Sequence, residues 1–233
     1  MARTKKDGWL TWGLAFIFLL IDLLCSRLLF GMRWHHQLAF SLRHAVSPLI
    51  GVWGGLLSVC ILFVTKGLIH ACAAWGSRLM LVWHLPTLCG TLYLTLLGRD
   101  RRWVRALAAV PALVCMFLFW LHPVGRQAPL YPLYWLIPIA IALSTWKNFF
   151  LHALGSTFCA HAVGSTLWLY GGLLASPTAW NALIPVVAFE RFGFACLMTT
   201  VFLAVTALVS LGRAVHTKYR SHQPIPLLNS QKQ

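Results

Sequence analysis

The chain has 233 residues, of which 59% are hydrophobic and 10% charged, and its four acidic residues leave a formal net charge of +15. This composition lies far outside the range of soluble domains, and a chain of this length holds one compact bundle without a separate soluble domain. In a soluble protein such a charge would suggest nucleic acid. In a membrane protein, Lys and Arg set the orientation and meet anionic headgroups, so we predict a lipid bilayer as the surroundings and no nucleic-acid partner.

Apolar segments follow one another along the whole chain and predict an all-α polytopic membrane protein. We expect a compact bundle of six spanning helices plus one re-entrant or short segment, within a single transmembrane domain at 1–212; seven spans are the alternative. The polar tail, 213–233, contains two prolines, and we expect it to be cytoplasmic and disordered. The seven segments are 9–31, 47–65, 79–97, 104–121, 130–146, 149–174 and 179–211.

The distribution of Lys and Arg determines only part of the orientation. The excess of positive charge on the cytoplasmic side is the same whether six or seven segments cross. Both arrangements place Gly98–Arg105 (GRDRRWVR), Lys147 and the C-terminal tail in the cytoplasm. A short basic N-terminus favours six spans with both ends inside. We expect a multi-pass protein of the cell membrane, specifically a bacterial inner membrane.

Segment 149–174 is rich in small and polar residues for a helix in hydrocarbon. It reads FFLHALGSTFCAHAVGSTLWLYGGLL, with His152, His161 and two Gly-Ser-Thr triplets. Unpaired polar groups in hydrocarbon are costly, so this helix should be surrounded by other helices or by a water-filled cavity. Nine residues separate the two histidines and place them on opposite sides of the helix, so they cannot bind one metal together from this helix alone.

The last apolar segment carries two adjacent charges, Glu190 and Arg191. Charges within a membrane are rare and mark ligand or proton sites, although a structural ion pair is the equal alternative. Adjacent helical residues point about 100° apart. We therefore expect each of these side chains to contact a different partner rather than the other.

One short stretch is similar to a known family. Ala160–Gly164 (AHAVG) is similar to the AHxxG segment that carries the catalytic histidine of rhomboid intramembrane proteases. That resemblance implies a serine nucleophile in a G-x-S-G setting on an earlier span, because the histidine acts only as the base for a hydroxyl. The chain contains no G-x-S-G, so we do not assign it to this family.

The leading hypothesis is a small membrane transport component that binds a modest-sized solute in a polar intramembrane pocket. In size, helix count and topology the chain looks like the substrate-binding subunits of energy-coupling-factor vitamin importers. That likeness implies a separate ATPase and a membrane coupling subunit as partners. A membrane-embedded lipid or isoprenoid enzyme and a structural or assembly protein are the alternatives. We predict no catalytic residue, metal or cofactor, and the predicted solute-binding residues are His84, His152, Ser156, His161, Ser165, Glu190 and Arg191.

Overall fold

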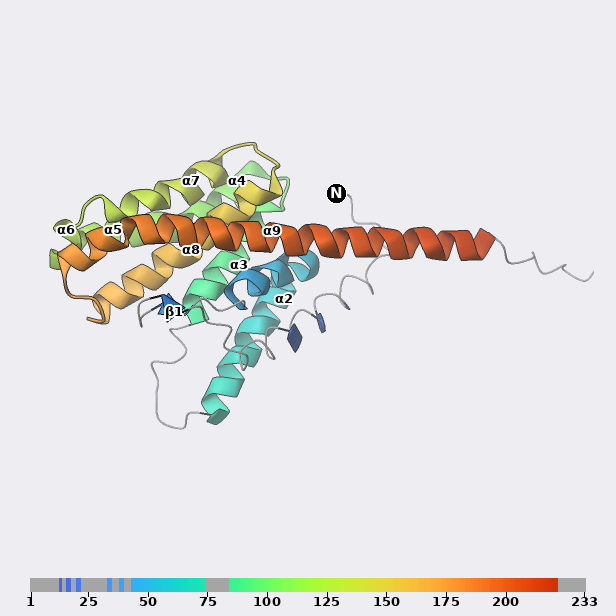
Figure 1. Ribbon diagram of the computed structural model, residues 1–233, viewed down its shortest axis with the longest axis horizontal. Coiled ribbons are helices and arrows are strands. Elements are labelled where there is room, and N and C mark those ends of the chain that lie inside the picture. The colour runs from blue at the N-terminus through green and yellow to red at the C-terminus, as the bar shows by residue number, and fades with distance from the viewer. Residues whose placement is uncertain are drawn as a thin grey trace, which may run out of the picture. The chain divides into compact units, whose positions relative to one another are not determined.

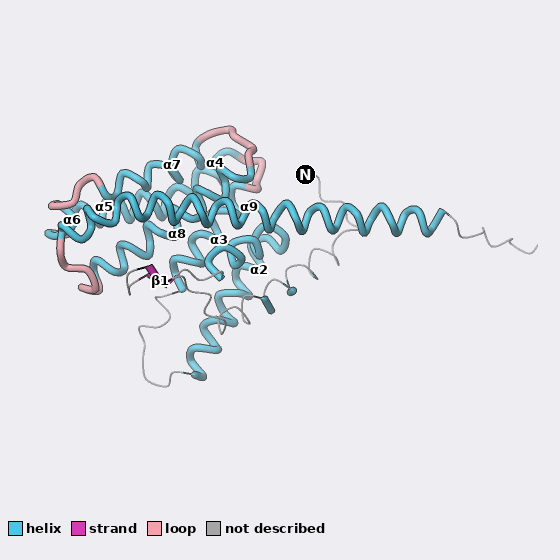
Figure 2. The backbone as a smooth tube through the Cα atoms, viewed as in Figure 1, coloured by secondary structure: helices cyan, strands magenta, loops and turns pink. Residues whose placement is uncertain are grey.

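The computed structural model describes residues 43–73 and 84–221, together with positions 13, 16, 17, 20, 21, 33, 34, 38 and 39. Most of the predicted segment 9–31, the start of segment 79–97 and residues 222–233 lie outside the described residues. The chain divides into two compact units, Met1–Thr199 and Thr200–Gln233. The elements (Figures 1 and 2) are β1 (Arg33–Trp34), β2 (Leu38–Ala39), α2 (Arg43–Ala73), α3 (Leu85–Leu97), α4 (Arg102–Ala106), the 3₁₀ turn η3 (Leu107–Ala109), α5 (Val110–Leu121), α6 (Pro123–Arg126), the 3₁₀ helix η4 (Tyr131–Trp135), α7 (Leu136–Leu143), α8 (Phe149–Tyr170) and α9 (Pro177–Ser221).

The described residues are almost entirely helical, as the sequence predicts. The two short strands pair antiparallel, with Arg33 opposite Ala39 and Trp34 opposite Leu38. Three stretches are long and apolar enough to cross a membrane, namely Ser47–Thr65, Arg102–Leu121 and Pro177–Ala214. The protein is therefore an all-α protein with several candidate membrane spans. Two further apolar helices, Leu85–Leu97 and Tyr131–Leu143, are shorter, and the number of crossings stays a prediction.

The C-terminal part of the chain differs from the expected disordered tail. Helix α9 continues through Gly212 to Ser221, so residues 213–221 are helical. The sequence 213–221 contains neither proline nor glycine, and nothing in it interrupts a helix that already has many turns. The two prolines that suggested disorder, Pro224 and Pro226, come after the last helical residue.

Helix α8 packs against α3, α5 and α7, so neighbouring helices provide the surroundings, the first of the two that the sequence predicts. The Oδ1 atom of Asn148 accepts hydrogen bonds from the backbone N–H groups of Phe150 (2.8 Å) and Leu151 (3.4 Å) and so caps the helix start. At the other end, Gly172 adopts φ +68°, a left-handed conformation that glycine tolerates without strain. Local sequence thus determines both ends of the central helix.

Helices α3 and α8 approach closely because small residues line their contact. A Cβ atom on Gly90 would lie 3.1 Å from the Cβ of Ala160, and one on Gly155 would collide with the Tyr93 ring. The Ser156 hydroxyl donates a 2.7 Å hydrogen bond to the Gly90 carbonyl. Small residues and hydroxyls of this kind hold helices together in membranes, where the hydrophobic effect between helices is absent.

The opposite side of α3 packs against α2 in a similar way. A Cβ atom on Gly51 would collide with Thr95, and Thr91 lies beside the same position. Both threonine hydroxyls donate 2.7 Å hydrogen bonds to carbonyls one turn earlier in α3. Toward Gly51, Thr91 presents its methyl group and Thr95 its hydroxyl oxygen. Gly55, four residues further along α2, has φ +68° and interrupts the helix there.

Candidate functional site

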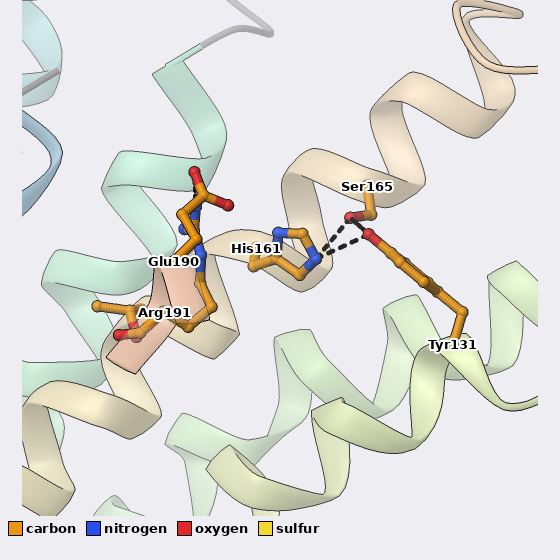
Figure 3. A network of polar contacts seen from close by, with 6 residues as sticks. Tyr131, His161, Ser165, Glu190 and Arg191 are labelled. Atoms are coloured by element: carbon orange, nitrogen blue, oxygen red, sulfur yellow. Dashed lines mark hydrogen bonds and ion pairs between the residues drawn. The ribbon is translucent and has the colours of Figure 1, made fainter. Parts of the chain in front are cut away.

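A hydrogen-bonded triad of polar side chains lies between η4 and α8. The Tyr131 hydroxyl is 2.8 Å from Nε2 of His161 and 3.1 Å from Oγ of Ser165, and Ser165 Oγ is 3.2 Å from the same Nε2 (Figure 3). His161 and Ser165 are one turn apart on α8, so both reach toward Tyr131. An imidazole that contacts two hydroxyls can accept or release a proton without leaving a buried group unpaired.

Aromatic rings surround Tyr131 and hold its hydroxyl in place. Phe119 of α5 stacks on the Tyr131 ring at a centroid distance of 5.4 Å, and Trp180 of α9 meets it edge-on at 4.8 Å. Trp135 lies edge-on at 6.2 Å. All four rings are buried, each with at most 1% exposure. Rings from α5, η4 and α9 therefore fix the tyrosine of the triad.

The charged pair on α9 does not have the arrangement expected from the sequence. Arg191 Nη2 lies 2.6 Å from Glu190 Oε1, and the two side chains are only 13% and 11% exposed. The expectation that each residue would contact a different partner was wrong. Both side chains are long, so their heads meet even though their Cα–Cβ bonds diverge around the helix.

The side chain and the backbone carbonyl of Arg191 have further contacts that tie this residue to the bundle. Its guanidinium carbon lies 4.9 Å from the centre of the Phe194 ring, a cation–π arrangement. Its carbonyl accepts a 3.3 Å hydrogen bond from Thr157 of α8. Figure 3 shows the pair on the side of His161 away from the two hydroxyls. We call Tyr131, His161, Ser165, Glu190 and Arg191 the polar cluster.

The other predicted site residues lie elsewhere. His152 Nε2 is 2.8 Å from the Trp146 carbonyl at the start of α8, about 13 Å along the helix from His161. Ser156 is fully buried and bonds to Gly90 in the contact with α3. His84 is buried immediately before α3. The structure thus brings together four of the seven predicted residues: His161, Ser165, Glu190 and Arg191.

Sequence reasoning missed Tyr131, whose hydroxyl bonds to both His161 and Ser165. Its only sequence signal is the aromatic, proline-containing run YPLYW, which reads as part of an ordinary apolar segment. In the described part of the chain, no group of three or more His, Cys, Asp or Glu side chains is placed to hold a metal ion. What the polar cluster offers instead is one cation, one carboxylate, one imidazole and two hydroxyls.

Comparisons with protein family models, with curated proteins and with solved structures find no match to this chain. We therefore infer the function from the arrangement of the polar cluster and of the apolar helices.

Proposed function

We propose that this protein is a small multi-pass membrane transport component that binds a modest-sized polar solute at the polar cluster. The set of proposed solute-binding residues then comprises the polar-cluster side chains from η4, α8 and α9. Arg191 and Glu190 would pair with charged groups of the solute, and His161 with its hydroxyl partners would hold or move a proton.

One observation supports this proposal above the others. The Glu190–Arg191 pair and the His161 triad lie in one region of a protein with four acidic residues in all. Ionisable side chains within membrane helices are expensive, and they mark solute or proton sites by default. Both side chains keep some exposure, 13% for Arg191 and 11% for Glu190, so the described part of the chain does not enclose the pair completely.

The test compares two histidine variants of the full-length protein. Wild type, His161→Gln and His152→Gln are purified from the native membrane in mild detergent, and bound small molecules are released and identified by mass spectrometry. We expect a solute retained by wild type and His152→Gln, and reduced about tenfold in His161→Gln, the effect of one lost hydrogen bond to a polar ligand.

His152 is the matched control because it is an imidazole on the same helix, bonded to a backbone carbonyl at the helix start. Equal sets of bound molecules on all three folded proteins would contradict the proposal. Recovery of an ATPase together with a second membrane protein in the same purification would support the more specific form, a substrate-binding subunit of a larger importer.

A structural or assembly role is the second candidate, and one observation favours it. The hydroxyls of Ser156 and Thr157 donate to carbonyls of α3 and α9, so part of the polarity of α8 fastens helices together. This candidate predicts that His161→Gln leaves bound small molecules unchanged and instead alters stability or the set of co-purifying membrane proteins.

A further inference from the structure

One end of the bundle carries a cluster of exposed cations and tryptophans that the polar cluster does not use. Two segments supply it, the stretch from Gly98 to Arg105 and the loop 144–148 between α7 and α8. We call this the basic end. Its exposed side chains are Arg99, Arg101, Arg102, Lys147, Trp103 and Trp146.

One hydrogen bond joins the two segments, and others fix the loop. Arg105 donates to the Trp146 carbonyl at 3.2 Å, and His152 lies 2.8 Å from the same oxygen. The Trp146 N–H donates to Ser144 Oγ at 3.3 Å, and Asn148 caps α8. The basic end is therefore preorganised, so an anion that binds there does not have to order the backbone first.

The cations of the basic end are not neutralised within the described part of the chain. Arg99, Arg101, Arg102 and Lys147 form no ion pair there, and among the described residues Asp100 is the one carboxylate in these two segments. Like charges held together without acidic partners favour a bound anion.

The tryptophans indicate where that anion comes from. Trp103 is 62% exposed and is the second residue of the candidate span Arg102–Leu121. Trp146, 54% exposed, lies in the loop that Arg105 contacts. Tryptophans at the end of a span lie at the level of the lipid headgroups, so the cations beside them meet headgroup phosphates rather than bulk water.

We propose that the basic end binds the headgroup of an anionic phospholipid from the leaflet that faces the cytoplasm. The phosphate of the lipid contacts Arg101 and Arg102, and Trp103 packs at the boundary between headgroup and acyl chain. This site lies apart from the polar cluster and does not depend on the identity of the transported solute.

The experiment measures retention of isotope-labelled phosphatidylglycerol by full-length protein immobilised in neutral detergent. Variant Arg101→Gln/Arg102→Gln removes two exposed cations that form no ion pair with any described residue. Variant Arg126→Gln is the control, because Arg126 is an exposed cation beyond the opposite end of the same candidate span. Each charge near a membrane surface contributes about fivefold, so the double variant should bind phosphatidylglycerol about 25-fold more weakly.

Additional binding measurements distinguish a lipid headgroup from free phosphate as the bound anion. Wild type should prefer phosphatidylglycerol over phosphatidylcholine, inorganic phosphate should not displace the lipid, and added NaCl should weaken binding in wild type by screening. The proposal is overturned if the double variant binds phosphatidylglycerol as well as Arg126→Gln does. It is also overturned if inorganic phosphate displaces the lipid at equal concentration, or if the double variant loses an acidic protein partner but no lipid.

Discussion

The α3–α8 contact and the polar cluster both contain serine hydroxyls, but these hydroxyls have different roles in the two regions. In the α3–α8 contact, Ser156 donates to a single backbone carbonyl. Glycines on both helices allow the two backbones to approach so closely that an added Cβ would have no room. In the polar cluster, about two and a half turns further along α8, Ser165 bonds to two other side chains. A serine bonded to backbone stabilises a helix pair, whereas a serine bonded to imidazole and phenol belongs to a network whose protons can move.

The two regions also differ in charge and access. The α3–α8 contact is uncharged, with Gly155 and Ser156 buried. The polar cluster holds an ion pair whose side chains keep 11–13% exposure. This difference explains why one helix, α8, serves as a packing surface on one side and as a candidate site on another. It also predicts different responses to substitution.

The largest effect is expected from breaking the ion pair. Glu190→Gln leaves the Arg191 guanidinium without its carboxylate, and losing one member of a mostly buried pair costs about 3 kcal/mol of stability. The measurement is the free energy of unfolding in mixed detergent and denaturing micelles. Glu190→Gln/Arg191→Gln is the comparison variant, since removing both charges should recover most of the loss. A single variant as stable as wild type would mean that water or lipid headgroups already solvate Arg191.

The next largest effect is expected from Gly155→Ala in the uncharged contact. The new methyl group would collide with Tyr93, whose hydroxyl is held by a 2.7 Å bond to the Pro138 carbonyl, so overpacking should cost about 1–3 kcal/mol. Gly164→Ala on the same helix is the control. Its methyl group would meet Pro86 at 3.6 Å, an ordinary contact, and alanine favours helix by up to about 1 kcal/mol. Equal melting temperatures for the two variants would contradict the close packing of α3 on α8.

The sequence predicted what depends on local pattern. Apolar runs of the required length identified the candidate spans, and segment 47–65 coincides with Ser47–Thr65. The polar content of segment 149–174 predicted a helix surrounded by other helices or by a water-filled cavity, and α8 packs against three other helices. These features depend on the hydrophobicity and length of single segments, which a sequence displays directly.

What the sequence did not predict depends on contacts between distant segments. Tyr131 and His161 are 30 residues apart, and only the packing of η4 on α8 makes them partners. The Glu190–Arg191 pair was missed for a different reason. A helical wheel describes Cβ directions, whereas the heads of long side chains can turn back toward each other.

Tyr131→Phe is expected to lose less stability than Glu190→Gln or Gly155→Ala, but also to lose the bound solute. The phenylalanine keeps the stacking with Phe119 and loses two hydrogen bonds, while His161 and Ser165 remain 3.2 Å apart and bonded to each other. We expect about 1–2 kcal/mol of destabilisation and loss of the solute retained by wild type. Stability is read from unfolding and binding from mass spectrometry of bound molecules. Retention of the solute at the wild-type level would remove Tyr131 from the proposed site.

The smallest effect is expected from Ser156→Ala, the counterpart of Tyr131→Phe in the other region. Hydrogen bonds between membrane helices contribute about 0.6 kcal/mol on average, and the alanine methyl fits the space that the serine Cβ already occupies. The variant should therefore lose about 0.6 kcal/mol of stability in unfolding measurements and retain the solute at the wild-type level in mass spectrometry. If Ser156→Ala released the solute while Tyr131→Phe retained it, the α3–α8 contact would be the binding region. The ion pair and the triad of the polar cluster would then only stabilise the packing of helices, which is the role that Ser156 has in the α3–α8 contact.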